Sequence, residues 1–157
     1  MSKTPLLAVE VVAMANVYWQ TNLNIPAMPR GFHIITPLAY DALTDMPGIQ
    51  TGLLNLFIQH TSVSLTISEN TCQDVQTDLE SFYNHIAPDD NRLYTHTLEG
   101  EDDMPAHIKN SLLGASINIP IQDNKLCLGQ WQGIYLCEHR NQAPSRKIIL
   151  TVSGKEL

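Results

Sequence analysis

The sequence feature that most constrains the fold is a nearly continuous apolar run at residues 52–58, followed by an alternating apolar and polar segment at residues 63–68. A short continuous run is typical of a strand buried on both faces, whereas alternation is typical of a strand with one solvent-facing side. Beyond residue 70, apolar side chains recur on one helical face, at Val75, Leu79, Phe82, Tyr83 and Ile86. This change of period predicts a central strand, a half-buried strand and then a helix, with Asn70 as its N-cap and Gln73 as the capping-box partner.

Further elements are predicted on both sides of this segment. Pro37 begins a short helix that Pro47 and Gly48 stop, and Asp103 caps another helix that ends at Gly114. The remaining segments with strand character are residues 17–24, 32–36, 116–121, 125–128, 133–138 and 147–152. This order predicts an α+β fold, with a mixed, mostly antiparallel β-sheet and two or three helices on one side.

Length and charge restrict the classes of partner. The 157 residues fit one domain, which we place at residues 17–157 after a leader at residues 1–16. The apolar part of this leader is interrupted by Glu10 and is shorter than a membrane span, so no membrane partner is expected. The net charge of -7 with scattered cations argues against nucleic acid. The three cysteines lack the spacing of a metal or redox motif, which favours a reducing, cytoplasmic location.

Three histidines are candidates for a metal site. His60 ends the buried central strand, while His96 and His107 flank an acidic loop at residues 87–103. If the fold brings these imidazoles together with Asp103 as a carboxylate ligand, they form a site for a divalent metal ion, zinc or magnesium, with an open position. His60 and His107 are then also candidate catalytic residues. Buried histidines with satisfied hydrogen bonds would give the same pattern.

Glu69 is a third candidate catalytic residue. It stands between a strand and a helix, where a carboxylate is placed to act as a general base or to orient an imidazole. Its neighbour Asn70 is a candidate substrate-binding residue, although helix capping alone would explain it. Ser116, which begins a predicted strand, is a further candidate of this kind.

A glycine-framed segment at residues 129–135 is the other candidate binding element. Its Trp131 offers an aromatic wall and Gln132 offers amide hydrogen bonds, but a hairpin turn with a core Trp is an equally good interpretation. Lys109 and Arg140 are candidate phosphate ligands, with solvated surface cations as the alternative.

Four motifs, taken together and in order, resemble the YjbQ-like family. They are Gln59–Ser62 (QHTS), Leu65–Asn70 (LTISEN), Glu99–Lys109 (EGEDDMPAHIK) and Gly129–Tyr135 (GQWQGIY). The resemblance covers roughly residues 17–154. It implies an α+β fold that forms a homotrimer through its β-sheets.

The resemblance also implies a weak or secondary thiamine-phosphate synthase activity. This transferase reaction joins a pyrimidine pyrophosphate to a thiazole phosphate and releases pyrophosphate. It needs a divalent cation, cationic side chains and an aromatic surface. Asp102 and Asp103 are available for the cation, Lys109 and Arg140 for the phosphates, and Trp131 for the ring.

Two other functions use the same residues. In a metal-dependent hydrolase of a small phosphorylated substrate, His60, His96 and His107 hold the ion and Glu69 is the base. In a non-enzymatic trimeric ligand-binding module, no metal binds. The expected partners are therefore a small phosphorylated molecule and further copies of the chain.

Overall fold

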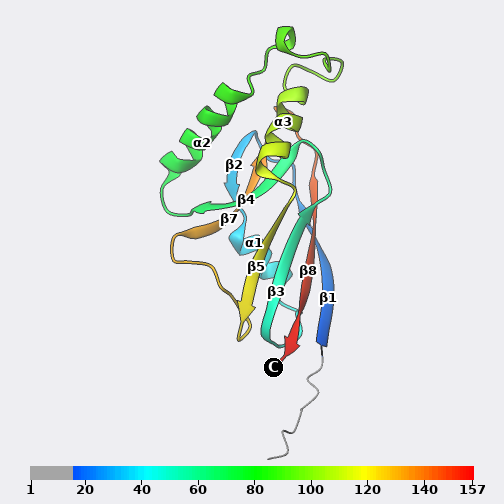
Figure 1. Ribbon diagram of the computed structural model, residues 1–157, viewed down its shortest axis with the longest axis vertical. Coiled ribbons are helices and arrows are strands. Elements are labelled where there is room, and N and C mark those ends of the chain that lie inside the picture. Colours follow the sequence, from blue (N-terminus) through cyan, green and yellow to red (C-terminus); the bar gives the residue numbers. More distant parts are fainter. Residues whose placement is uncertain (1–15) are drawn as a thin grey trace, which may run out of the picture.

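The apolar run at residues 52–58 lies in β3 (Ile49–Ile58), the central strand of a five-stranded sheet (Figure 1). The computed structural model describes residues 16–157. In spatial order the sheet contains β1 (Asn16–Ile25), β8 (Arg146–Glu156), β3, β5 (Ser116–Gln122) and β6 (Lys125–Leu126), and neighbouring strands are antiparallel. The expected leader, residues 1–16, lies outside the described residues except for Asn16, the first residue of β1.

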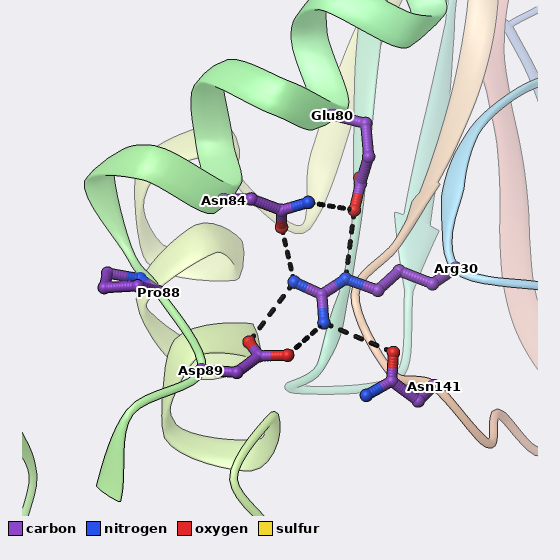
Figure 2. A pocket seen from close by; sticks show the side chains of 6 residues that line it. All are labelled: Arg30, Glu80, Asn84, Pro88, Asp89 and Asn141. Carbon is purple, nitrogen blue, oxygen red and sulfur yellow. Dashed lines mark hydrogen bonds and ion pairs between the residues drawn. The ribbon is translucent and has the colours of Figure 1, made fainter. Parts of the chain in front are cut away.

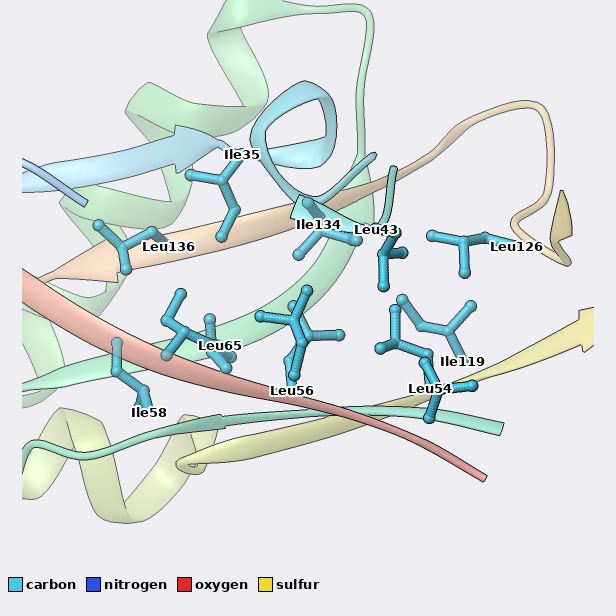
Figure 3. Packing of buried hydrophobic residues seen from close by; sticks show 14 of the residues in the cluster. Ile35, Leu43, Leu54, Leu56, Ile58, Leu65, Ile119, Leu126, Ile134 and Leu136 are labelled. Atoms are coloured by element: carbon cyan, nitrogen blue, oxygen red, sulfur yellow. The ribbon is translucent and has the colours of Figure 1, made fainter. Parts of the chain in front are cut away.

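A second, three-stranded sheet packs against the first. Its order is β2 (Gly31–Ile34), β7 (Gln132–Glu138) and β4 (Val63–Glu69), again antiparallel. Alternate side chains of each strand face one side, and those between the sheets form the main core (Figure 3), which includes Leu54, Leu56, Ile58, Leu65, Ile134 and Leu136. The predicted α+β class is confirmed, with the strands divided between two sheets.

The helical elements are α1 (Thr36–Ala42), α2 (Gln73–Ile86), the 3-10 turn η1 (Asn91–Leu93) and α3 (Asp103–Leu113). Helices α2 and α3 cover the other face of the three-stranded sheet, whereas α1 packs into the main core through Ala39. Leu79 and Tyr83 of α2 and Leu113 of α3 pack against a small buried cluster of Phe32, Tyr135 and Cys137. In Figure 1, α2, α3 and the loop between them lie at the end of the molecule opposite the C-terminus. No helix within residues 16–157 has the length and apolar character needed to span a bilayer.

The start of α2 differs from the prediction. The helix begins at Gln73 with Cys72 as the N-cap, so the prediction that Asn70 caps it is wrong. Glu69 accepts hydrogen bonds from the backbone amides of Thr71 and Cys72, at 3.2 and 3.0 Å. A carboxylate here satisfies amides that the first turn leaves unpaired. Glu69 therefore binds the amides that precede the helix, a role that the predicted capping box gave to Asn70 and Gln73.

Within residues 16–157, no element covers the outer face of the five-stranded sheet. Tyr18, Leu53 and Phe57 lie on this face with 80%, 40% and 45% of their surface exposed. Ile148 and Leu150, by contrast, are fully buried in the main core, so they do not belong to any surface that another chain contacts. Their neighbours along β8 point outward because side chains of a strand alternate. The outer face therefore has exposed apolar side chains among polar ones.

The core between the sheets predicts unequal effects for two leucines. Leu56→Ala should lower the free energy of unfolding by about 2 to 5 kcal/mol, because it removes buried methyl groups and leaves a cavity. The matched change Leu38→Ala, at a 39% exposed position on α1, should cost roughly 1 kcal/mol or less. Urea denaturation of both variants measures the difference, and equal costs would contradict this packing.

Candidate metal centre

Two imidazoles and one carboxylate meet at the start of α3. Asp103, 1% exposed, is the first residue of the helix, and His107 follows one turn later on the same face. His96 reaches this point from the loop after η1. Asp103 Oδ2 lies 2.8 Å from His96 Nε2 and 3.2 Å from His107 Nε2. One ligand atom from each residue lies within 4.8 Å of the others. The structure therefore brings together three of the four residues predicted to bind a metal.

His107 faces Asp103 in a way that requires a positive charge. Its Nδ1 lies 2.9 Å from the backbone oxygen of Thr61. A carbonyl can only accept, so Nδ1 carries the proton, and Nε2 of the neutral ring then has a lone pair. That lone pair is directed at a carboxylate oxygen, which is also an acceptor. Either a second proton or a metal ion between them makes this contact favourable. A carbonyl that fixes the tautomer of an imidazole is common around bound metals.

Arg140 is committed to the carboxylates beside this group. It donates to Asp103 Oδ1, to Asp102 Oδ2 at 3.1 Å, and to the backbone oxygen of Glu99 at 2.8 Å. Burial would raise the pKa of Asp102, but the amide of Asn141 and the charge of Arg140 outweigh it and lower that pKa. The predicted phosphate ligand Arg140 therefore holds the acidic residues in place.

His60 does not join the metal group. Its Nε2 accepts a hydrogen bond from the backbone amide of Lys147, at 3.0 Å. Burial, with the nearby charge of Arg146, lowers the pKa of His60 and favours the neutral ring. A metal cannot bind through a nitrogen whose lone pair is already used, so the four-residue metal set is reduced to His96, Asp103 and His107.

Glu69 lies at the far end of β4. Val63, near the metal group, pairs with Glu138, whereas Glu69 pairs with Gln132 at the opposite end of the two strands. Six residues of extended chain span roughly 20 Å. The structure therefore does not place Glu69 beside the histidines, where the predicted general base would have to lie.

The segment containing Trp131 shares this far end. Trp131 is 58% exposed. The side chain of Asn70 donates to the backbone oxygens of Gln130 and Gln132, at 3.3 and 3.1 Å, and Gln132 Oε1 accepts from the amide of Gly129 at 2.7 Å. The amide side chains predicted to bind substrate therefore brace the turn. Ser116 lies elsewhere, opposite Phe57 on the edge of the outer face.

Lys109 is buried beneath an ion-pair network rather than presented to a ligand. It is fully buried, and its Nζ donates to Asn84 Oδ1 at 2.6 Å. Asn84 also accepts from Arg30, which donates in addition to Glu80 at 3.0 Å and Asp89 at 2.5 Å. Arg30, Glu80, Asn84 and Asp89, drawn in Figure 2, line a hollow of about 420 Å³. The carboxylates there balance the cations, so the hollow does not favour a phosphate.

Sequence reasoning missed Arg30 and other buried polar residues. Arg30 stands alone between prolines and a glycine, and its partners lie 50 to 111 residues away. Glu138 and Arg146 form a buried ion pair at 2.7 Å. Ser64 Oγ lies 2.8 Å from Nε2 of His139. Burial, together with nearby cations that include Lys109, lowers the pKa of this histidine to about 3. None of these contacts has a local sequence signal.

Known proteins resemble this chain over most of its length. A model of the family described as "UPF0047 protein YjbQ-like" matches residues 21–155. The chain is 45% identical over 139 residues to the UPF0047 protein YjbQ of Salmonella typhimurium, which covers 88% of this chain and 100% of that protein. It is 47% identical over 114 residues to a UPF0047 protein of Synechocystis, with 73% and 78% covered.

Solved structures show the same fold. A YbjQ-like protein of unknown function from Sulfolobus solfataricus is 20% identical, with a TM-score of 0.80 and coverage of 89% of this chain and 99% of that one. A conserved hypothetical protein of Thermus thermophilus is 31% identical, with a TM-score of 0.71 and coverage of 82% and 97%.

The buried position of Lys109 predicts a specific dependence of stability on pH. Burial and the nearby charge of Arg30 lower the pKa of Lys109 from 10.5 to about 8. Between these values the folded chain binds fewer protons at this residue than the unfolded chain, so its contribution makes the free energy of unfolding rise with pH. Urea denaturation should therefore show wild type gaining stability relative to Lys109→Met from pH 8 to 10.5. A constant difference between the two proteins would contradict this.

Proposed function

The chain belongs to the YjbQ-like UPF0047 family, as its motifs predicted, and we propose that it binds a divalent metal ion through His96, Asp103 and His107 and uses it on a small phosphorylated molecule. The observation that carries this proposal is the 3.2 Å contact between His107 Nε2 and Asp103 Oδ2. Because Thr61 fixes the tautomer of His107, a cation between these acceptors completes the arrangement.

The donor set favours zinc over magnesium. Imidazole nitrogens suit zinc-like ions, whereas magnesium prefers an all-oxygen shell. Three protein ligands leave a position open for water or substrate, as in catalytic rather than structural zinc sites. Thr61 orients His107, and Arg140 holds the second oxygen of Asp103, so the chain itself supplies the supporting contacts.

Hydrolysis of a phosphate ester is the reaction that this geometry supports best. A zinc-like ion held by His96, Asp103 and His107 would supply a Lewis acid and would lower the pKa of a neighbouring water molecule. The residues that hold it, His96, Asp103 and His107, lie at one end of the three-stranded sheet. Thiamine-phosphate synthesis would also need a free cationic side chain to bind the pyrophosphate leaving group. Arg140 is not free, because it is paired with Asp102 and Asp103.

Thiamine-phosphate synthesis is the second candidate, and one observation favours it. Trp131 is 58% exposed on a braced turn, as an aromatic platform for a pyrimidine would be. Trp131 and the metal group lie at opposite ends of β4 and β7. The two would have to come from different subunits to act on one molecule.

We also propose that the chain forms a homotrimer through the outer face of its five-stranded sheet. Tyr18 and Leu53 lie exposed in one row across this face, on either side of Ser153 of β8, and no element of residues 16–157 covers it. Apolar side chains on a bare sheet face are stabilised when another subunit buries them.

Metal loading of matched variants tests the site. Wild type dialysed against zinc and then metal-free buffer should retain about one ion per chain by elemental analysis, as a three-ligand site predicts. His107→Ala and Asp103→Asn should lose retention by tenfold or more, because each removes a ligand. His33→Ala is the control, since the side chain of His33 bonds the backbone oxygen of Pro29 through Nε2 and is not part of the metal group.

The same variants distinguish the candidate activities. Phosphate release from small monoesters should require His107 and should be unchanged in Trp131→Ala, whereas thiamine-phosphate formation should be lost in both. A wild-type protein that retains no zinc would reject the metal site and favour the ligand-binding module. Zinc retention by His107→Ala at the wild-type level would place the ion elsewhere.

Light scattering tests the assembly. Wild type should have a mass of about three chains. Leu53→Asp should dissociate it, because it places a charge within the buried interface. Leu38→Asp on α1 should not, although Leu38 and Leu53 are similarly exposed, at 39% and 40%. A wild-type monomer at micromolar concentration would contradict the proposal.

A further inference from the structure

A hollow of about 370 Å³ lies beside the proposed metal site. Its walls are mostly apolar and are formed by Phe57, Ile58, Gln59, His60, Thr61, Asn110 and Ala115. This volume is within the range of small-molecule sites.

The hollow and the metal group share a wall. The backbone oxygen of Thr61 accepts a hydrogen bond from His107 Nδ1 at 2.9 Å. Asn110, one turn further along α3, donates to the backbone oxygen of Val63 at 2.6 Å. The ring of His107 thus connects this wall to Asp103. Thr61 therefore belongs both to the lining of the hollow and to the support of His107.

His60 gives the hollow a hydrogen-bond donor. The amide of Lys147 can only donate, so Nε2 of His60 holds a lone pair. A neutral imidazole has one N–H group, which must then be on Nδ1. Burial lowers the pKa of His60, in agreement with a neutral ring. Among the hydrogen bonds of residues 16–157, none occupies this Nδ1.

The other walls are preformed. The backbone amide of Ile58 donates to the backbone oxygen of Ala115 at 2.8 Å, and the backbone amide of Gln59 donates to the backbone oxygen of Lys147 at 3.0 Å. Phe57 is 45% exposed, so it offers a flat aromatic surface on the open side. An aromatic ring stacks favourably on such a surface. A rigid, mostly apolar hollow with one fixed donor is suited to a ring that has a hydrogen-bond acceptor.

We propose that this hollow binds the uncharged part of the substrate, a flat aromatic or heteroaromatic ring with an acceptor for His60 Nδ1, while the phosphate of the same molecule lies at His96, Asp103 and His107. The location of the phosphate rests on the proposed function. Ring binding does not, because none of the residues that form the hollow is a metal ligand.

Two alcohols of the same shape test the ring site on metal-free protein. Pyridin-3-ylmethanol has a ring nitrogen acceptor, and benzyl alcohol does not. In amide NMR titrations, both should shift signals of residues 57–61, 110 and 115. The pyridine should bind about two- to tenfold more tightly, as one net hydrogen bond predicts.

Three variants identify the wall that is responsible. His60→Gln can still accept from the amide of Lys147 but lacks the N–H at the Nδ1 position, so it should bind both alcohols equally. Phe57→Ala should weaken binding of both alcohols, because it removes the aromatic surface. His96→Ala should weaken zinc retention, because it removes a ligand, and leave the preference for pyridine intact, which separates the ring site from the metal site.

Several outcomes would overturn the proposal. They are signal shifts outside the hollow, equal binding of the two alcohols by wild type, or a preference for pyridine that persists in His60→Gln. Signals of residues 57–61 that change with protein concentration and not with either alcohol would show that another copy of the chain occupies the hollow. Loss of phosphate hydrolysis with ring binding intact would reject the proposed function alone.

Discussion

Asp103 lies at the first turn of α3, nearly fully buried, with partners at both carboxylate oxygens. Arg140 donates to one oxygen, and His96 and His107 face the other. A carboxylate buried to this extent is stable only when hydrogen bonds and opposite charge compensate for lost water. This requirement joins the loop after η1, the start of α3 and the segment after β7. The position of each proposed metal ligand follows from it.

The rest of the molecule holds these segments in register. Backbone pairing in the three-stranded sheet fixes the end of β7, and Arg140 follows two residues later. The backbone oxygen of Thr61 fixes the ring of His107. Arg30 links the end of α2 to Asp89 and Asn141, and the amide of Asn141 donates to Asp102. The polar groups thus form one connected network at this end of the small sheet. At the opposite end of this sheet, Asn70 and Gln132 brace the turn of Trp131.

The features that the sequence predicted correctly are those that depend on residues close together along the chain. The strands and helices follow from apolar periodicity, and Asp103 and His107 meet because residues four apart share a helical face. The positions of His60 and Glu69 depend instead on strand register and on which backbone groups need partners, and no short motif reports either. From the sequence, Lys109 was a candidate phosphate ligand or a surface cation. Its burial was not predicted, because it depends on Arg30, whose partners lie far along the chain. The division of the strands into two sheets was missed for the same reason.

The most direct test of a metal ion bound at Asp103 is anomalous diffraction from zinc-soaked crystals. The account predicts a peak at the zinc edge about 2.0 to 2.2 Å from His96 Nε2, His107 Nε2 and a carboxylate oxygen of Asp103. It also predicts that His60 still accepts from the amide of Lys147. A map without a peak between these three side chains, or with zinc bound to His60 instead, would contradict it.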